Sequence, residues 1–258
     1  MRHGTYNDRL GILIGLIIGL VIGSTGLGGG VLTAPILILF MGLSPAESVG
    51  TALVFSAAAK VSGALVYLNR GQVDFRVLGH LLAGGVPGAA VGALSLGRIP
   101  AAGSNGVVLI IIGAAVVASA GFSLFGRRGE LAPRVSRTGL LPVLSFPVGV
   151  GAGFSSAGAG ALGTLLLFSF TNLTPAVVVG TDLVFGMAVS AVGGGLHAAA
   201  GSWNGGLLLK LAGGGVVGAA AGSHLAAAIP ARVLRTVVLA AAMLLGFLLL
   251  ERGLEGAW

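Results

Sequence analysis

Three ionisable side chains stand inside long apolar stretches of this sequence, where charge is otherwise rare. Lys60 lies well within the stretch 46–68, Asp182 follows Gly180-Thr181 in the stretch 175–200, and His197 lies near the end of that stretch. An ammonium group at membrane depth is costly and should face a cavity or a partner. Lys60 is therefore predicted to contact an anionic substrate or an ion. The alternative is that its long side chain reaches back to the nearby interface.

The carboxylate and the imidazole admit several roles. Asp182 could pair with Lys60, carry a coupling proton, or cap a broken helix near the interface, and the sequence leaves these roles open. His197 could relay protons, because its ordinary pKa lies near neutrality. A lone histidine near a helix end is more often a packing residue, so His197 is a weaker candidate than Lys60.

Two glycine-rich motifs also interrupt apolar stretches. The first motif runs from Gly23 to Gly30 and the second from Gly153 to Gly160. Glycine disfavours helix by about 1 kcal/mol relative to alanine, so each motif should break its helix. Free backbone N–H groups at the start of the next half-helix would then bind an anion. The predicted binding residues are Ser24, Thr25, Gly26, Gly28, Gly29, Ser155 and Ser156; the alternative is that the glycines only permit tight helix crossing.

Composition places the chain in a membrane. Of its 258 residues, 55% are apolar and 8% are charged, whereas soluble domains carry roughly a quarter charged residues. We expect an all-α integral membrane protein with about eight transmembrane helices, the first helix of each half being broken at its glycine-rich motif. The small-residue spacings Gly84/Gly88/Gly92 and Gly214/Gly218/Gly222 predict close helix packing.

The same composition excludes several classes of function. The chain has no cysteine, which excludes disulfides and thiolate metal sites. There is no clustered set of acids, bases or metal ligands at depth, so we expect neither an enzyme nor a cofactor or metal. The net charge of +7 reflects membrane topology rather than a nucleic-acid partner.

The sequence predicts an internal repeat. One constant shift in residue number, without a gap, aligns Pro45 with Pro175, Gly50-Thr51 with Gly180-Thr181, and Ile99-Pro100 with Ile229-Pro230. We call this offset the repeat shift. Residues 1–125 then form the first half, 126–138 a basic linker, and 139–258 the second half.

Two topologies fit the arginine distribution. We favour eight crossings with both termini and the linker in the cytoplasm, which makes the two halves parallel. However, the first stretch of each half exceeds the length of a simple span. If each folded back at its motif as a re-entrant hairpin, each half would cross three times and the halves would be inverted.

Several ordered motifs resemble the TauE/SafE family of sulfite exporter-like permeases. They are the segment from Gly23 to Pro35, the segment from Pro45 to Leu53, and Tyr67 to Asp74 followed by a glycine-rich helix ending at Ile99-Pro100; Thr174 to Asp182 repeats the layout. The second motif departs from the pattern, since Phe154, Ser155, Ser156 and Ala157 replace glycine-rich positions. The two breaks are therefore not expected to be equivalent.

This resemblance implies a permease of the cell inner membrane that moves sulfite, an organosulfonate or a related small anion, mostly outward. Alternating access of two repeat halves is the mechanism expected of such a protein. The alternatives are an anion channel or a non-transporting membrane subunit that anchors a partner. The expected partners are the anionic substrate and the lipid bilayer, with self-association into a homo-oligomer left open.

Overall fold

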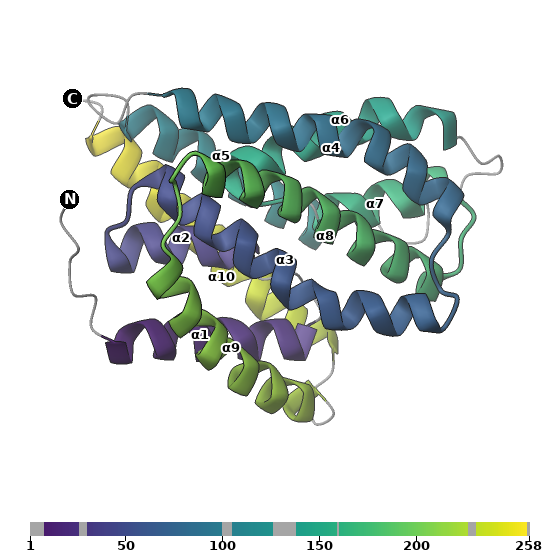
Figure 1. Cartoon of the computed structure of the whole chain (residues 1–258), viewed down its shortest axis with the longest axis horizontal. Coiled ribbons are helices and arrows are strands. Elements are labelled where there is room, and N and C mark those ends of the chain that lie inside the picture. Colours follow the sequence, from purple (N-terminus) through teal and green to yellow (C-terminus); the bar gives the residue numbers. More distant parts are fainter. Residues whose placement is uncertain are drawn as a thin grey trace.

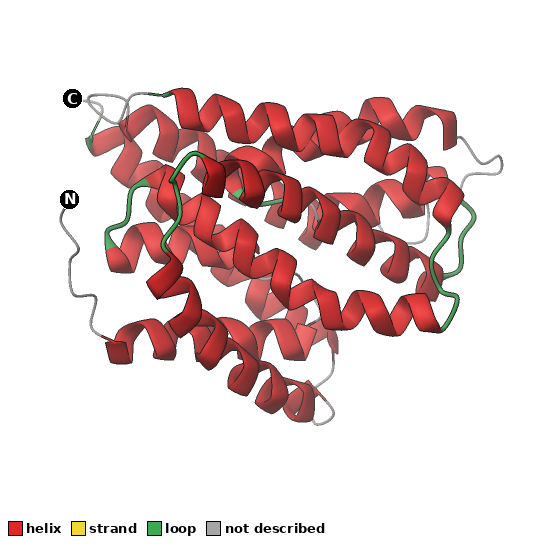
Figure 2. Cartoon of the chain, viewed as in Figure 1, coloured by secondary structure: helices red, strands yellow, loops and turns green. Residues whose placement is uncertain are grey.

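The described part of the chain is entirely helical. The computed structural model describes residues 8–25, 30–99, 105–125, 138–158, 160–226 and 231–256, and within these residues every regular element is a helix (Figures 1 and 2). The elements are α1 (Asp8–Thr25), α2 (Gly30–Met41), α3 (Pro45–Asn69), α4 (Phe75–Arg98), α5 (Asn105–Phe125), the 3-10 turn η1 (Thr138–Leu140), α6 (Leu141–Ser155), α7 (Ala161–Phe170), α8 (Pro175–Ala199), α9 (Gly205–Ala226) and α10 (Ala231–Glu255).

Seven of the described helical segments are long and apolar enough to cross a membrane. They comprise α3, α4, α5, α8, most of α9 and α10, and the segment formed by η1 and α6, while the apolar segments in α1 and α2 are shorter. Each of the two long first stretches is divided into two helices, α1 and α2 in one and α6 and α7 in the other. The prediction of a multi-pass helical membrane protein with broken first segments is confirmed.

Local sequence explains where the central helices begin. Ser44 caps α3 by accepting a hydrogen bond from the backbone N–H of Glu47, and Pro45 occupies the first turn, where its missing N–H is harmless. Asp74 caps α4 through Val77 N–H at 2.9 Å. Asn204 caps α9 in the same way through Leu207 N–H at 2.9 Å.

Several contacts recur under the repeat shift. The N–H of Asp74 donates to Thr181 Oγ1 at 3.0 Å, and the N–H of Asn204 donates to Thr51 Oγ1 at 3.0 Å. The bounds of α8 are likewise those of α3 moved by the same offset. The shift that aligns the sequence therefore also relates contacts between the ends of the central helices.

The central helices α3 and α8 run in opposite directions. A Cβ atom built on Gly63 would lie 3.1 Å from Leu183, and one on Gly193 would lie 3.1 Å from Leu53. Residue numbers thus rise along one helix as they fall along the other. Since these two helices correspond under the repeat shift, the corresponding segments are inverted, and the parallel arrangement favoured from the sequence is wrong.

The first stretch returns to the side from which it enters. Near the start of α1, Gly11 faces Leu207 at the start of α9, and the adjacent Asn204 binds Thr51 at the start of α3. Because α2 leads directly into α3, the start of α1 and the end of α2 lie on one side of the molecule (Figure 1). This is the re-entrant alternative.

The second stretch does the same from the opposite side. α6 runs alongside α4 in the same direction, since Gly84 meets the backbone of Pro142 and Gly92 meets that of Val150. α7 then leads back to the start of α8, where Thr181 binds Asp74 at the start of α4. The two helix pairs α1–α2 and α6–α7 therefore enter from opposite sides.

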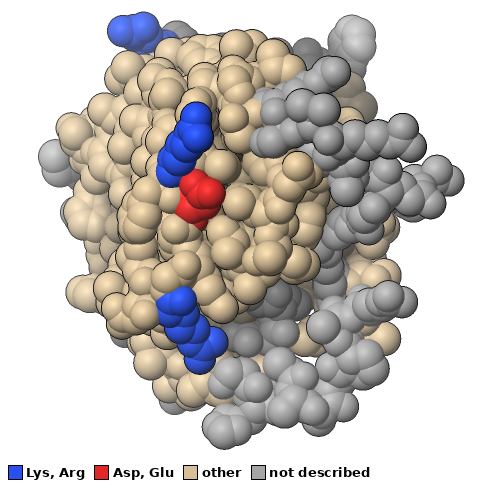
Figure 3. Space-filling model, turned by 90° about the vertical axis from the view of Figure 1, so that its right-hand side faces the viewer, with Lys and Arg blue, Asp and Glu red and all other residues tan. Residues whose placement is uncertain are grey.

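We call the two sides of the molecule the terminal side and the linker side. α1 begins and α10 ends on the terminal side, where Arg252 Nη1 donates to the carbonyl oxygen of Leu39 at the end of α2. α5 ends and η1 begins on the linker side, which Figure 3 views directly. Basic side chains stand out there on an otherwise largely uncharged surface. Arg70 and Arg76 flank the connection between α3 and α4 on this side, and Arg232 and Arg235 fall in the first turns of α10. In the sequence, four more arginines lie between the end of α5 and the start of η1, outside the described residues: Arg127, Arg128, Arg134 and Arg137.

Small residues bring helices of the two halves into close contact, as their spacing predicts. A Cβ atom on Gly88 would overlap the carbonyl oxygen of Phe146 in α6, and one on Gly218 would overlap that of Leu16 in α1. Larger side chains would separate these helices. The small-residue stripes on α4 and α9 therefore hold the two re-entrant pairs in place.

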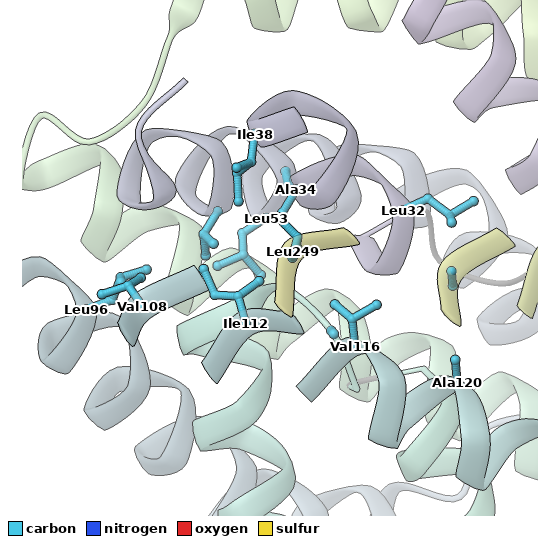
Figure 4. Close-up of a cluster of buried hydrophobic side chains, with 14 of the residues drawn as sticks. Leu32, Ala34, Ile38, Leu53, Leu96, Val108, Ile112, Val116, Ala120 and Leu249 are labelled. Carbon is cyan, nitrogen blue, oxygen red and sulfur yellow. The ribbon is translucent and has the colours of Figure 1, made fainter. Parts of the chain in front are cut away.

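The largest apolar cluster joins α10 of the second half to α2, α3 and α5 of the first half. Figure 4 shows Ala34 and Ile38 of α2 on the side of the cluster where Ile112 of α5 and Leu249 of α10 lie. All of these side chains are buried. The cluster fixes the re-entrant helix α2 against full-length helices, which positions the break between α1 and α2.

Candidate functional site

The two breaks meet inside the molecule. Ser156, at the end of α6, has a left-handed backbone with a φ of 58°, and its Oγ donates to the carbonyl oxygen of Gly30, the first residue of α2, at 2.7 Å. A Cβ atom on Gly30 would lie 2.6 Å from the carbonyl oxygen of Ser156. Glycine at position 30 is thus required for the close approach, and the contact joins the second motif to the end of the first.

The hydroxyl groups of the second motif are engaged locally. Ser155 Oγ donates to the carbonyl oxygen of Gly151 at 2.7 Å and accepts from the N–H of Ala157 at 3.3 Å. Ser156 uses its proton on Gly30. A hydroxyl has a single donor, so in this conformation both serines stabilise the break itself. Their predicted role in holding substrate stays a prediction.

The predicted binding residues of the first motif fall largely outside the description. Gly26, Gly28 and Gly29 lie outside the described residues, as do the side chains of Ser24 and Thr25. Their predicted role as anion ligands stays a prediction.

Lys60 lies one helical turn beyond the meeting point of the breaks. Its side chain is 8% exposed. Ser56, one turn earlier on α3, has its Oγ 3.6 Å from the position of a Cβ atom on Gly30. Lys60 is thus one helical turn from a side chain that lies beside the point where the two breaks touch.

Asp182 of α8 is the acidic partner of this region. Its side chain is 6% exposed, and its charge interacts electrostatically with the Lys60 ammonium. Thr164 Oγ1 on α7 donates to Asp182 Oδ2 at 2.5 Å. A Cβ atom on Gly163 would overlap Asp182 Oδ1, so Gly163 makes room for the carboxylate. The three roles left open for Asp182 stay predictions.

The charged pair lies deep in the helix bundle, closer to the linker side. At about 1.5 Å of rise per residue, Lys60 lies about 14 Å from the end of α3 and Asp182 about 10 Å from the start of α8. Both helix ends lie on the linker side. This depth and burial make an interfacial, solvated position of either group untenable in this conformation.

His197 binds the second re-entrant pair to α8. Its ring is 1% exposed, and Nε2 lies 3.1 Å from the carbonyl oxygen of Gly153, to which it donates. Its Cβ atom would lie 2.8 Å from a Cβ atom on Gly50. His197 lies near the terminal-side end of α8, away from Lys60 and Asp182. Its contacts are those of a packing residue, and the relay role stays a prediction without support.

Sequence reasoning missed Thr164 and Gly163. Both lie just after the second motif in a run that otherwise reads as apolar helix, and no spacing rule singles them out. The only available signal was that they follow the break. Within the described residues no group of histidine, cysteine, aspartate or glutamate side chains is arranged to hold a metal ion.

Comparison with known protein families gives a match over most of the chain. The family described as sulfite exporter TauE/SafE matches residues 11–249. This range includes both motifs, Lys60, Asp182 and the re-entrant pairs. No solved structure matches the chain.

Curated relatives are described as transporters. The chain is 27% identical over 238 residues to the probable membrane transporter protein YjnA of Bacillus subtilis, covering 88% of this chain and 93% of that protein. It is 29% identical over 180 residues to the probable membrane transporter protein YtnM of the same organism, covering 67% of this chain and 58% of that protein.

Proposed function

Because the chain belongs to the sulfite exporter TauE/SafE family of membrane transporters, we propose that it is a secondary permease for a small anion. The substrate class is sulfite, an organosulfonate, or a related sulfur-containing or organic anion, and transport runs outward. The family supplies the class of substrate, and the residues around Lys60 supply the chemistry.

The observation that carries this proposal is a buried ammonium group beside the meeting point of two helix breaks. Lys60 is buried within one helical turn of Ser56, which lies next to the Gly30–Ser156 contact. A membrane protein tolerates irregular backbone at depth only against protein or a water-filled cavity. Intramembrane ionisable residues mark substrate or ion pathways. A positive charge near the start of α2, the positive end of that helix dipole, suits a small oxyanion.

Alternating access follows from the inverted arrangement of corresponding helices. Transporters built from inverted repeats place their substrate site near the membrane midplane, at discontinuous helices, and rock one half against the other. The pairs α1–α2 and α6–α7 enter from opposite sides and meet at Ser156 and Gly30. We propose that residues 1–125 and 139–258 are the two moving halves.

The orientation we propose puts the linker side in the cytoplasm of a cell whose inner membrane holds the protein. Positively charged loops face the cytoplasm, and most arginines belong to segments that join on the linker side. The termini then face outward. This revises the expectation of cytoplasmic termini. That expectation placed the arginines near the termini and those of the linker on the same side of the membrane.

A substitution of Lys60 tests the proposal. Purified protein is reconstituted in proteoliposomes, and sulfite flux is compared for wild type, Lys60→Gln and the matched control Lys210→Gln on α9. A charge-assisted hydrogen bond contributes about 1.5–3 kcal/mol, so Lys60→Gln should lower flux at low sulfite about 10- to 100-fold. Lys210→Gln should keep the wild-type rate. Wild-type flux in well-folded Lys60→Gln would contradict the proposal.

A further inference from the structure

We propose that the transported anion balances the charge of Lys60 in place of the Asp182 carboxylate, and that a proton which neutralises this carboxylate moves together with the anion. This inference rests on the proposed function and adds the coupling of anion movement to proton movement. It follows from the charge balance of the buried pair and from a hydroxyl group that can serve both protonation states of the acid.

Charge balance sets the requirement for a proton. Lys60 and Asp182 are both buried, and their charges interact. Removing one partner from a buried pair leaves an uncompensated charge, which is strongly unfavourable. If an anion binds Lys60 while Asp182 stays ionised, the site carries one excess negative charge. When an aqueous proton adds to the carboxylate, the ammonium pairs with the charge of a monovalent anion and the total charge of the site is unchanged.

Thr164 can accommodate both states of the acid. Its Oγ1 lies 2.5 Å from Asp182 Oδ2 and 2.9 Å from the carbonyl oxygen of Gly160, and both are hydrogen-bond acceptors. A hydroxyl has one proton, so it can donate to only one of them at a time. With Asp182 ionised, the proton of Thr164 points to Oδ2. With Asp182 protonated, the acid donates to Thr164, which turns its own proton to Gly160.

This exchange connects the acid to the second helix break. Gly160 immediately precedes α7 and is the last residue of the motif whose Ser156 contacts Gly30. Protonation of Asp182 would therefore shift the proton of Thr164 from Asp182 Oδ2 to the carbonyl oxygen of Gly160, at the start of α7. The coupling acts at the element that an alternating-access cycle must move.

Other titratable groups on the neighbouring helices lie toward helix ends. On α3, Tyr67 lies against Gly180, toward the linker side, and on α4 the first turns carry Arg76 and His80, the latter bonded to the carbonyl oxygen of Arg76. Asp74 caps α4 at the same level. α6 and α7 contain no titratable side chain, and His197 lies at the far end of α8 bonded to Gly153. Lys60 and Asp182 are thus the pair whose charges must be balanced.

The test measures proton and anion movement together. Proteoliposomes containing a pH-sensitive dye are clamped at zero voltage, and a gradient of 2-hydroxyethanesulfonate is applied. The sulfonate of this probe stays ionised between pH 5 and pH 8, so any change of the flux with pH comes from a group of the protein. Wild type should move protons in the direction of the sulfonate. At pH values above the pKa of Asp182, each further pH unit should lower the sulfonate flux about tenfold, because the protonated fraction of the carboxyl group falls by that factor.

Asp182→Asn mimics the protonated acid and isolates its role. This variant should carry sulfonate without protons, with flux changing less than about twofold over the same range, since no proton is needed to balance the charge. Glu47→Gln, which neutralises a carboxylate bonded to Asn204 on the terminal side, should retain coupling. The double variant Lys60→Gln/Asp182→Asn should fold, as judged by a monodisperse elution profile, and carry no sulfonate.

The outcomes separate this inference from the function on which it rests. Sulfonate flux through wild type without proton movement overturns the coupling alone, as does unchanged coupling in Asp182→Asn. Absence of both sulfonate and sulfite flux through folded wild type overturns the proposed permease. The wild-type measurement decides the inference even if Asp182→Asn fails to fold.

Discussion

At the scale of single residues, the site depends on a carboxylate that occupies the space beside a glycine, which has no side chain. Gly163 lies directly against Asp182, and Thr164 beside it binds Oδ2. The absence of a Cβ atom at position 163 lets α7 approach α8 closely enough for this bond. The chemistry of the site therefore depends on a residue that itself has no functional group.

We expect Gly163→Ala to displace Asp182 from Thr164. The new Cβ atom would overlap Asp182 Oδ1, and relieving such overpacking costs about 1–3 kcal/mol. Thermal unfolding in detergent should show a lower midpoint for this variant. The matched control is Gly151→Ala on α6, whose Cβ atom meets nothing within 4 Å and whose midpoint should be no lower than that of wild type, since alanine favours helix over glycine. Equal midpoints for all three proteins would contradict the geometry assigned to Asp182.

At the scale of helices, the decisive feature is the direction of α3 relative to α8. Hydropathy could predict where these helices lie and that the first stretches break, and glycine spacing could predict the close contacts of α4 and α9. The sequence could not predict whether a broken stretch continues across the membrane or turns back, since both arrangements use the same apolar residues. The direction is set by tertiary contacts such as Thr51 with Asn204.

Cysteine labelling tests this topology without background, because the chain has no native cysteine. Asn69 ends α3 on the linker side and Glu255 ends α10 on the terminal side, and both are exposed. Asn69→Cys and Glu255→Cys should react with a membrane-impermeant thiol reagent from opposite sides of the membrane. With the linker side in the cytoplasm, Glu255→Cys reacts in spheroplasts and Asn69→Cys in inside-out vesicles. Labelling of both from one side would favour the parallel eight-crossing arrangement.

The candidate site was predictable only in part, for a physical reason. Lys60 and Asp182 stand out because charge is expensive in an apolar stretch. Thr164 does not stand out, since a threonine in a helix ordinarily satisfies its hydroxyl on the preceding turn, as Thr164 does with Gly160. Only the packing of α7 on α8 adds the second acceptor. The sequence also predicted donors at Ser155 and Ser156, whose protons the folded backbone uses.

At the scale of the whole molecule, two corresponding contacts differ in tightness. A Cβ atom on Gly85 would overlap the ring of Phe185, whereas one on Gly215 would lie 3.0 Å from the ring of Phe55. These pairs are related by the repeat shift and lie toward opposite sides of the breaks. In an alternating-access cycle the tight contact would loosen while the loose contact tightened. The site around Lys60 would then become accessible from the other side of the membrane.

The central claim is that the anion binds where the two breaks meet Lys60. A structure of the protein soaked with selenite in place of sulfite, with selenium located by its anomalous signal, tests this most directly. We expect a selenium peak at hydrogen-bond distance from Lys60 Nζ, beside the contact of Ser156 with Gly30. A well-occupied peak remote from both breaks, with the region around Lys60 empty, would contradict it.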